Sequence, residues 1–124
     1  MKKLDIQELK RLCESVCGID LSGIEIVQSE KMSWRKRTAK FSILKRNRIT
    51  ICGDNNYIPD LVPKICHEWQ HREDYIAHPI FYVFCMAVPF LRYYAHEPRA
   101  EAFEQLARLM LQEYYNNKQE KKTQ

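Results

Sequence analysis

The pattern of apolar and polar positions in the first 52 residues predicts a helix followed by three strands. Apolar residues recur at helical spacing over 5–17, and Gly18 is a residue type that ends many helices. The run 24–28 alternates between apolar and polar residues and is bounded by glycine and serine, which predicts a strand. Two further strands and the polar turn that joins them are expected at 38–44, 48–52 and 45–47.

Two helices are predicted next along the chain. The first begins near Pro59 or Asp60, with Asp60 as its capping residue, because a proline is tolerated in a first helical turn. This helix carries an apolar face and ends near His78. The run 80–91 is almost entirely apolar and is expected to form a second helix, buried in the core.

A last helix is expected to begin near Pro98. Its apolar face repeats at helical spacing through Ala100, Phe103, Ala107, Met110 and Tyr114. The polar tail 116–124 is expected to fray. One helix, three strands and three helices form an α+β pattern, and 124 residues fit a single domain, 1–124.

Length and cysteine content bear on where the chain works. The apolar run 80–91 has twelve residues and spans roughly 18 Å as a helix, against about 30 Å for a bilayer core, so an integral membrane span is not expected. Membrane contact through this run is the alternative to burial. Residues 1–10 lack the apolar stretch of a secretion signal, and five cysteines without a CxxC pair indicate reduced thiols. A cytoplasmic protein is therefore expected.

The chemistry of the chain centres on a five-residue motif on the helix that begins near Pro59. His67, Glu68 and His71 match HExxH. Residues four apart share one helix face, so both imidazoles can reach one metal ion. Imidazole suits zinc, and Glu68 follows the first ligand at a position where it can accept a proton from a water.

A catalytic zinc needs a third protein ligand, for which the sequence offers several candidates. A HExxHxxGxxH arrangement fails, because Asp74 and Ala77 stand where glycine and histidine are required. His96 and Glu97 remain. Glu97 is favoured because it opens the segment 97–101, EPRAE, at the start of a helix.

HExxH followed 26 residues later by EPRAE resembles the gluzincin pattern of zinc metallopeptidases, HExxH plus ExxA[DE]. The chain is similar to the M48-type peptidases, to the minigluzincins and to the ImmA/IrrE-type metallopeptidases, whose ExxAxxFA helix matches here at Glu97, Ala100 and Phe103. The resemblance covers residues 60–110. It implies a minimal zincin-like fold and a metalloendopeptidase activity with one zinc ion per chain.

The resemblance also implies roles for two acidic residues. Glu97 is the third ligand, and Glu101 hydrogen-bonds a ligand imidazole, although aspartate is the usual residue there. The two carboxylates share a helix face, and the small Ala100 between them allows close approach to the HExxH helix. The alternative is that Glu97, Glu101 and Glu104 form a solvated acidic first turn, which the helix dipole favours.

A peptide-bond hydrolase is the function that these residues predict. Glu68 is the general base, and the candidates for stabilising the oxyanion are His96, Tyr94 and Tyr75. Zincins resemble one another in holding an extended peptide or protein substrate on a sheet edge, and the strand 48–52 is the candidate edge. Two histidines and a glutamate would also accept manganese, cobalt or iron.

A basic segment supplies a second candidate function. Between Lys31 and Arg48 there are eight lysines or arginines and no acidic residue. The candidate contacts to nucleic acid or an acidic partner are Trp34, Arg35, Lys36 and Arg37. The alternative function is thus a weak or inactive zincin scaffold that binds through this hairpin, and the simplest explanation is a solvated hairpin whose lysines discourage edge pairing.

Overall fold

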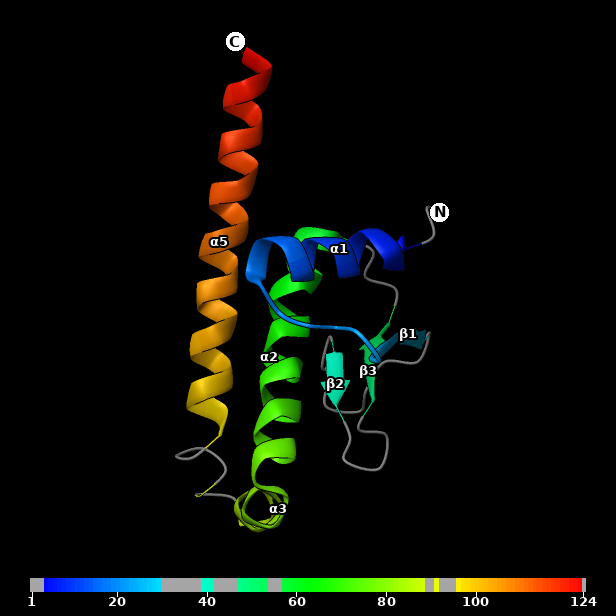
Figure 1. The fold of residues 1–124 in the computed structure, drawn as a ribbon, viewed down its shortest axis with the longest axis vertical. Helices are drawn as coiled ribbons and strands as arrows, with labels where there is room; N and C mark the ends of the chain where they lie inside the picture. Colours follow the sequence, from blue (N-terminus) through cyan, green and yellow to red (C-terminus); the bar gives the residue numbers. More distant parts are fainter. Residues whose placement is uncertain are drawn as a thin grey trace.

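A computed structural model describes residues 4–29, 39–41, 47–53, 57–88, 91 and 96–123. The described helices are α1 (Ile6–Cys17), α2 (Ile58–Ala77), α3 (Pro79–Ala87) and α5 (Glu97–Thr123). The described strands are β1 (Glu25–Ser29), β2 (Ala39–Phe41) and β3 (Arg48–Cys52). The α+β class is therefore confirmed, with an N-terminal helix, then a small sheet, then helices (Figure 1).

Helix α1 forms where its apolar pattern predicts. Asp5 caps its start, since the Asp5 carboxylate accepts a hydrogen bond from the backbone N–H of Glu8 at 3.1 Å. Gly18 ends it in the left-handed conformation, with φ of 72°. The inward face of α1 packs into the core through Leu9, Leu12, Cys13 and Cys17.

The sheet has the strand order β1-β3-β2. β1 pairs parallel with β3, with Ile26 opposite Ile49, and β2 pairs antiparallel with β3, with Ala39 opposite Ile51. The predicted antiparallel hairpin is confirmed, although 42–46 lie outside the described residues. The prediction that 48–52 forms the exposed edge is wrong, because β3 is central and its Ile49 and Ile51 are fully buried.

Helix α2 begins one turn earlier than the predicted Asp60 cap. Tyr57 occupies the capping position without a side-chain hydrogen bond, and Asp60 lies in the first turn. Pro59 explains the shift, because its fixed φ suits the first positions of a helix. Asp60 still complements the positive end of the helix dipole.

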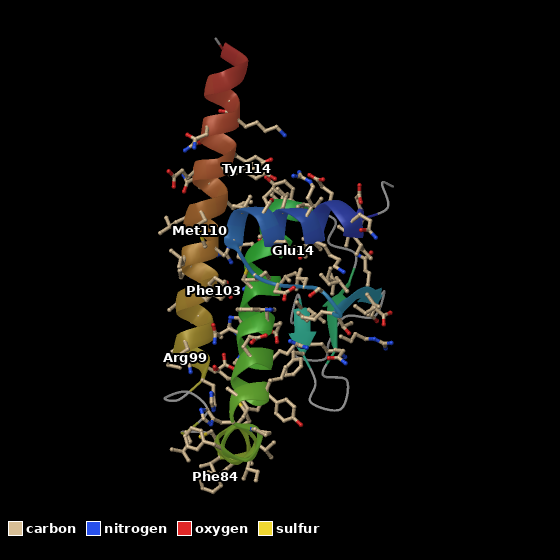
Figure 2. All side chains as sticks on the ribbon, in the orientation of Figure 1. Glu14, Phe84, Arg99, Phe103, Met110 and Tyr114 are labelled. Atoms are coloured by element: carbon tan, nitrogen blue, oxygen red, sulfur yellow. The ribbon has the colours of Figure 1, made fainter. Side chains whose placement is uncertain are left out.

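Helix α3 corrects the prediction of a buried core helix over 80–91. Only Tyr82 and Cys85 are buried, while Ile80 is 87% exposed and Phe84 also faces outward (Figure 2). Val88 has an extended backbone, as expected for a residue that precedes a proline, and it ends the helix at Ala87. Among the described helices, none is both long enough and apolar enough to cross a membrane.

Helix α5 lies alongside α2 and projects beyond the rest of the fold (Figure 1). Its predicted apolar face is confirmed, since Ala100 and Ala107 are fully buried and Phe103, Met110 and Tyr114 pack against the core. The prediction that 116–124 frays is wrong over most of its length, because the helix continues to Thr123. The glutamine, glutamate and lysine residues there are good helix formers.

The packing predicts unequal costs for two leucine truncations. Leu61 on α2 is fully buried, whereas Leu109 on α5 is 64% exposed. Leu61→Ala is expected to lower the free energy of unfolding by about 3 kcal/mol, because it leaves a cavity. Leu109→Ala is expected to change it by less than about 0.5 kcal/mol. Urea unfolding followed by circular dichroism measures both, and equal losses would contradict the placement of Leu61 in the core.

Candidate metal centre

Two helices bring three candidate ligands together. His67 and His71 lie one turn apart on α2, and Glu97 is the first residue of α5. The Nε2 atoms of the two histidines are 3.3 Å apart. Glu97 Oε1 lies 3.2 Å from His71 Nε2, and Glu97 Oε2 lies 3.5 Å from His67 Nε2. We call these three residues the donor triad.

The spacing of the donor triad fits a tetrahedral metal ion. Donors placed tetrahedrally around zinc at about 2.0–2.1 Å lie about 3.3–3.4 Å from one another. The distances of 3.2, 3.3 and 3.5 Å are close to that value, although Glu97 approaches His71 through Oε1 and His67 through Oε2. Facing lone pairs repel one another unless a proton or a cation lies between them, and a single metal ion could take the place of the protons that these three residues share. Three protein donors leave the fourth position for water or substrate.

Burial and charge prepare the donor triad for a cation. His71 is buried, and the Glu97 side chain retains 23% exposure, so the centre opens to solvent on the Glu97 side. Hydrogen bonds to His67 and His71 hold the pKa of Glu97 far below its usual value, which keeps it ionised. Burial lowers the pKa of His67, but the hydrogen bond to Glu97 and the charges of Glu68, Glu97 and Glu104 more than offset this, and the net shift is upward.

Glu104 orients the first histidine of the donor triad. His67 Nδ1 donates to Glu104 Oε1 at 2.9 Å, so a metal ion bound at Nε2 would take the place of the proton that Nε2 shares with Glu97. Lys64 and Arg108 donate to Glu104 Oε2 at 2.9 and 2.8 Å. Burial would raise the pKa of Glu104, but these two cations more than offset it and lower the pKa. Glu104 is thus an ionised acceptor fixed from three sides.

The role of imidazole partner was predicted for Glu101, and the structure gives the hydrogen bond to Glu104. Glu101 is exposed, although one of its carboxylate oxygens lies within 4.8 Å of the His67 and Glu104 donor atoms. Glu104 follows Glu97 by seven residues, so it lies on the same helix face. The available signal was the pair of cations at helical spacing, Lys64 before His67 and Arg108 after Glu104.

His96 lies beside the donor triad but does not belong to it. Among the described residues, the candidate ligand atoms of His67, His71 and Glu97 lie within 4.8 Å of one another, which favours Glu97 over His96 as the third ligand. His96 is buried, and its Nδ1 donates to Asp74 Oδ2 at 3.3 Å. Gln70 and Arg99 donate to Asp74 Oδ1 at 3.0 and 3.1 Å. This buried carboxylate was missed in the sequence, where position 74 was considered only as a place that lacked glycine.

The remaining predicted site residues are placed unevenly. Glu68 is partly buried on α2, next to His67. The Tyr75 ring packs at 5.8 Å from that of Tyr82, which in turn lies 6.2 Å from the His71 ring. Tyr82 forms a wall of the centre that sequence reasoning missed. The predicted residues that lie outside the described part of the chain are Tyr94, Trp34, Arg35, Lys36 and Arg37.

Comparisons with known proteins identify no relative of this chain. No protein-family model matches the chain, and neither a curated protein nor a solved structure matches it significantly. The candidate metal centre therefore stands on the donor triad and its orienting partner, Glu104.

Replacing the orienting carboxylate is expected to weaken metal binding. Glu104→Gln removes the charge that fixes the Nδ1–H tautomer of His67, and zinc affinity should fall about 10–100-fold. Glu101→Gln is the matched control, and its zinc affinity should stay within about twofold of wild type. Competition with a fluorescent zinc chelator measures both dissociation constants.

A third variant separates orientation from stability. Arg108→Gln removes a cation from Glu104 without touching His67, and it should keep zinc affinity better than Glu104→Gln. Thermal unfolding of the metal-free proteins monitors the fold in each case. A loss of affinity in Glu101→Gln that is absent in Glu104→Gln would assign the orienting role to Glu101 instead.

Proposed function

We propose that this chain is a zinc-dependent peptide-bond hydrolase of the gluzincin type, which holds one zinc ion through His67, His71 and Glu97. The observation that carries the proposal is the convergence of the donor triad at distances suited to a tetrahedral ion. A structural zinc site is usually closed by four protein ligands, whereas three ligands with an adjacent glutamate suit catalysis. Manganese, cobalt or iron would fit the same donors.

Glu68 is the proposed general base. Zinc, when bound, supplies a Lewis acid that lowers the pKa of a water toward about 7 and polarises a carbonyl. Glu68 accepts the proton of the attacking water and passes it to the leaving amine. Its negative charge contributes to the raised pKa of His67, which supports its placement beside the centre.

The edge strand β2 is the proposed support for an extended substrate. β2 lies at the edge of the sheet and packs beside α2, and the ring of Phe41 on β2 lies 6.4 Å from that of Tyr75 on α2. A peptide that adds to this edge would run past the face of α2 that carries the two histidines. β2 thus takes the role that was first expected for 48–52.

His96 is the candidate that the geometry favours for stabilising the oxyanion. Asp74 accepts from His96 Nδ1–H, and within the described part of the chain His96 Nε2 has no hydrogen-bond partner, so His96 would donate to an oxyanion from Nε2 in its doubly protonated form. His96 also precedes the donor Glu97 directly. Tyr75 instead packs its ring between Phe41 and Tyr82.

A reducing compartment suits the thiols of the chain. All five cysteines are unpaired and buried, which supports a cytoplasmic location. The alternative of a binding scaffold rests on residues 31–48, and most of that segment lies outside the described residues.

Elemental analysis tests the metal assignment. Wild-type protein purified without chelator and offered zinc is expected to hold about one zinc ion per chain, because three donors converge on one point. Glu97→Ala should hold much less, since only two imidazoles remain. Unchanged zinc in Glu97→Ala would move the third ligand, with His96→Ala next to be measured, and no zinc in wild type would refute the metal centre.

Glu68→Gln is expected to separate metal binding from turnover. The amide cannot accept the proton of the attacking water, so cleavage of casein should fall about 100–10,000-fold. Zinc content should stay that of wild type, because Glu68 is outside the donor triad. Mass spectrometry of the cleavage products measures turnover. Activity retained in Glu68→Gln would exclude it as the general base.

A further inference from the structure

A cavity lies one helical turn beyond the donor triad. It has a volume of about 320 Å³ and is lined by Asn47, Tyr75, Ile76 and Pro79. Tyr75 follows His71 by four residues, so it lies on the same face of α2 about 6 Å further along the helix axis. The Tyr75 ring contacts both Tyr82, which packs on His71, and Phe41 on the edge strand β2. Through Tyr75, the cavity is thus connected to the wall of the metal centre and to the edge proposed for substrate.

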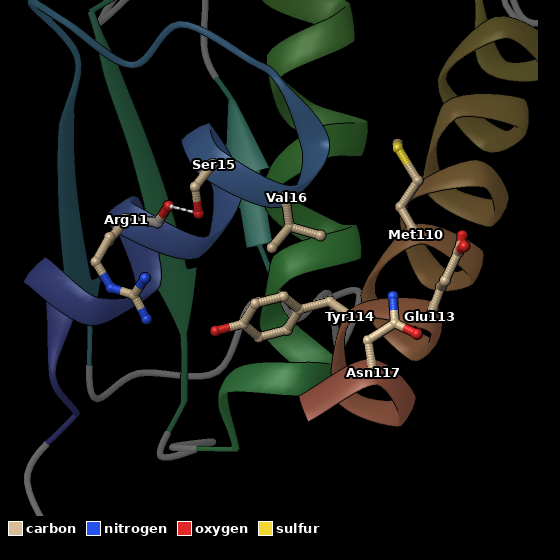
Figure 3. A pocket seen from close by; sticks show the side chains of 7 residues that line it. All are labelled: Arg11, Ser15, Val16, Met110, Glu113, Tyr114 and Asn117. Atoms are coloured by element: carbon tan, nitrogen blue, oxygen red, sulfur yellow. Dashed lines mark hydrogen bonds between the residues drawn. The ribbon is translucent and has the colours of Figure 1, made fainter. Parts of the chain in front are cut away.

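A larger cavity elsewhere lacks this connection. It lies between α1 and α5, has a volume of about 480 Å³ and includes the charged side chains of Arg11 and Glu113 (Figure 3). Its first lining residue on α5 is Met110, which is 13 residues or about 20 Å along the helix from Glu97. A peptide bond at the donor triad could not place an adjacent side chain there.

The walls of the cavity beside His71 suit an apolar side chain. Ile76 is 48% exposed, and with Pro79 and the ring of Tyr75 it forms a largely apolar lining. In the wall, Asn47 Oδ1 accepts a hydrogen bond from Arg72 at 3.1 Å. Among the described residues that line the cavity, none carries a charge to pair with a charged side chain, which disfavours acidic and basic residues there.

We propose that this cavity is a specificity pocket that accepts a bulky apolar side chain, such as phenylalanine or leucine, from an extended peptide seated on β2. The inference rests on the proposed hydrolase function and names the class of substrate for that site. Its volume is in the range of ligand-binding pockets and suits a large side chain better than alanine. The occupant is a peptide rather than an isolated small molecule, because Tyr75 in the pocket wall also packs against Phe41 of the edge strand β2.

Peptide binding without turnover tests the pocket. The protein is zinc-loaded Glu68→Gln, and the probes are fluorescein-labelled peptides Gly-Ser-Thr-Xaa-Ser-Thr-Gly in which Xaa is Phe, Leu, Ala or Asp. Fluorescence anisotropy gives the dissociation constants. The Phe and Leu peptides are expected to bind at least about tenfold more tightly than the Ala peptide, and the Asp peptide least tightly.

Three further variants locate the preference in the same Glu68→Gln background. Ile76→Asp places a charge in the pocket wall and should reduce the Phe-over-Ala ratio to less than about twofold. Leu109→Asp is the matched control, an exposed apolar residue on α5, and should keep the ratio. Phe84→Asp tests the outer face of α3 and should also keep it. Circular dichroism and thermal unfolding confirm that each variant is folded.

The outcomes separate this inference from the function beneath it. Equal affinities for the Phe and Ala peptides, or a preference that survives Ile76→Asp, would overturn the pocket. A preference lost in Phe84→Asp but kept in Ile76→Asp would also overturn it and assign binding to α3. Each of these results leaves the hydrolase in place if wild type cleaves casein and Glu68→Gln does not. Absence of zinc from the wild-type protein would overturn both.

Discussion

The close packing of α5 against α2 is the contact on which the metal centre depends. Ala100 and Ala107 are fully buried at this contact, and they are seven residues apart. Glu97 and Glu104 are also seven residues apart, and each precedes one of these alanines by three residues. The two alanines therefore bring the helix backbones close enough for the two carboxylates to reach His67 from different sides. A larger residue at either alanine would separate the histidines from both glutamates at once.

The contact between the helices includes a polar network in which the partly exposed Lys64 and Arg108 match the charge of the buried Glu104. Lys64 and Arg108 donate to the carboxylate that orients His67, so much of the charge of Glu104 is already neutralised. Glu104 consequently orients the imidazole more than it raises its basicity. Removing water from such groups is costly unless each is hydrogen-bonded, and the geometry meets that condition at Glu104. Glu97, by contrast, is partly exposed and lies near two imidazoles that carry no charge when they bind a metal ion. Its negative charge would then remain available to that cation.

Sequence predicted best where a single residue decides the local structure. Asp5 and Gly18 determine the ends of α1, and HExxH spacing places His67 and His71 on one face. The strand order could not be derived from the sequence. It depends on the parallel pairing of β1 with β3, which the residue pattern within a single strand does not specify. The exchange of Glu101 for Glu104 was missed for a similar reason. Both residues share the helix face, and which of them meets His67 depends on the registration of α5 against α2.

Helix α3 shows why an apolar sequence did not predict burial. A nine-residue helix that is apolar on every side can turn only a narrow face inward, and here Tyr82 and Cys85 occupy it. Tyr82 packs between the rings of His71 and His96, and Phe81 also contacts the ring of His96, so these contacts hold α3 at the site with its other residues facing outward. The apolar residues on the other side of α3 thus face outward because Tyr82 is used as a wall of the metal centre. A more polar outer face would be more soluble and would serve that wall equally well. Pro79 suits the first position of α3, whereas Ile76 on α2 leaves an apolar side chain 48% exposed, as the pocket proposed for an apolar side chain requires.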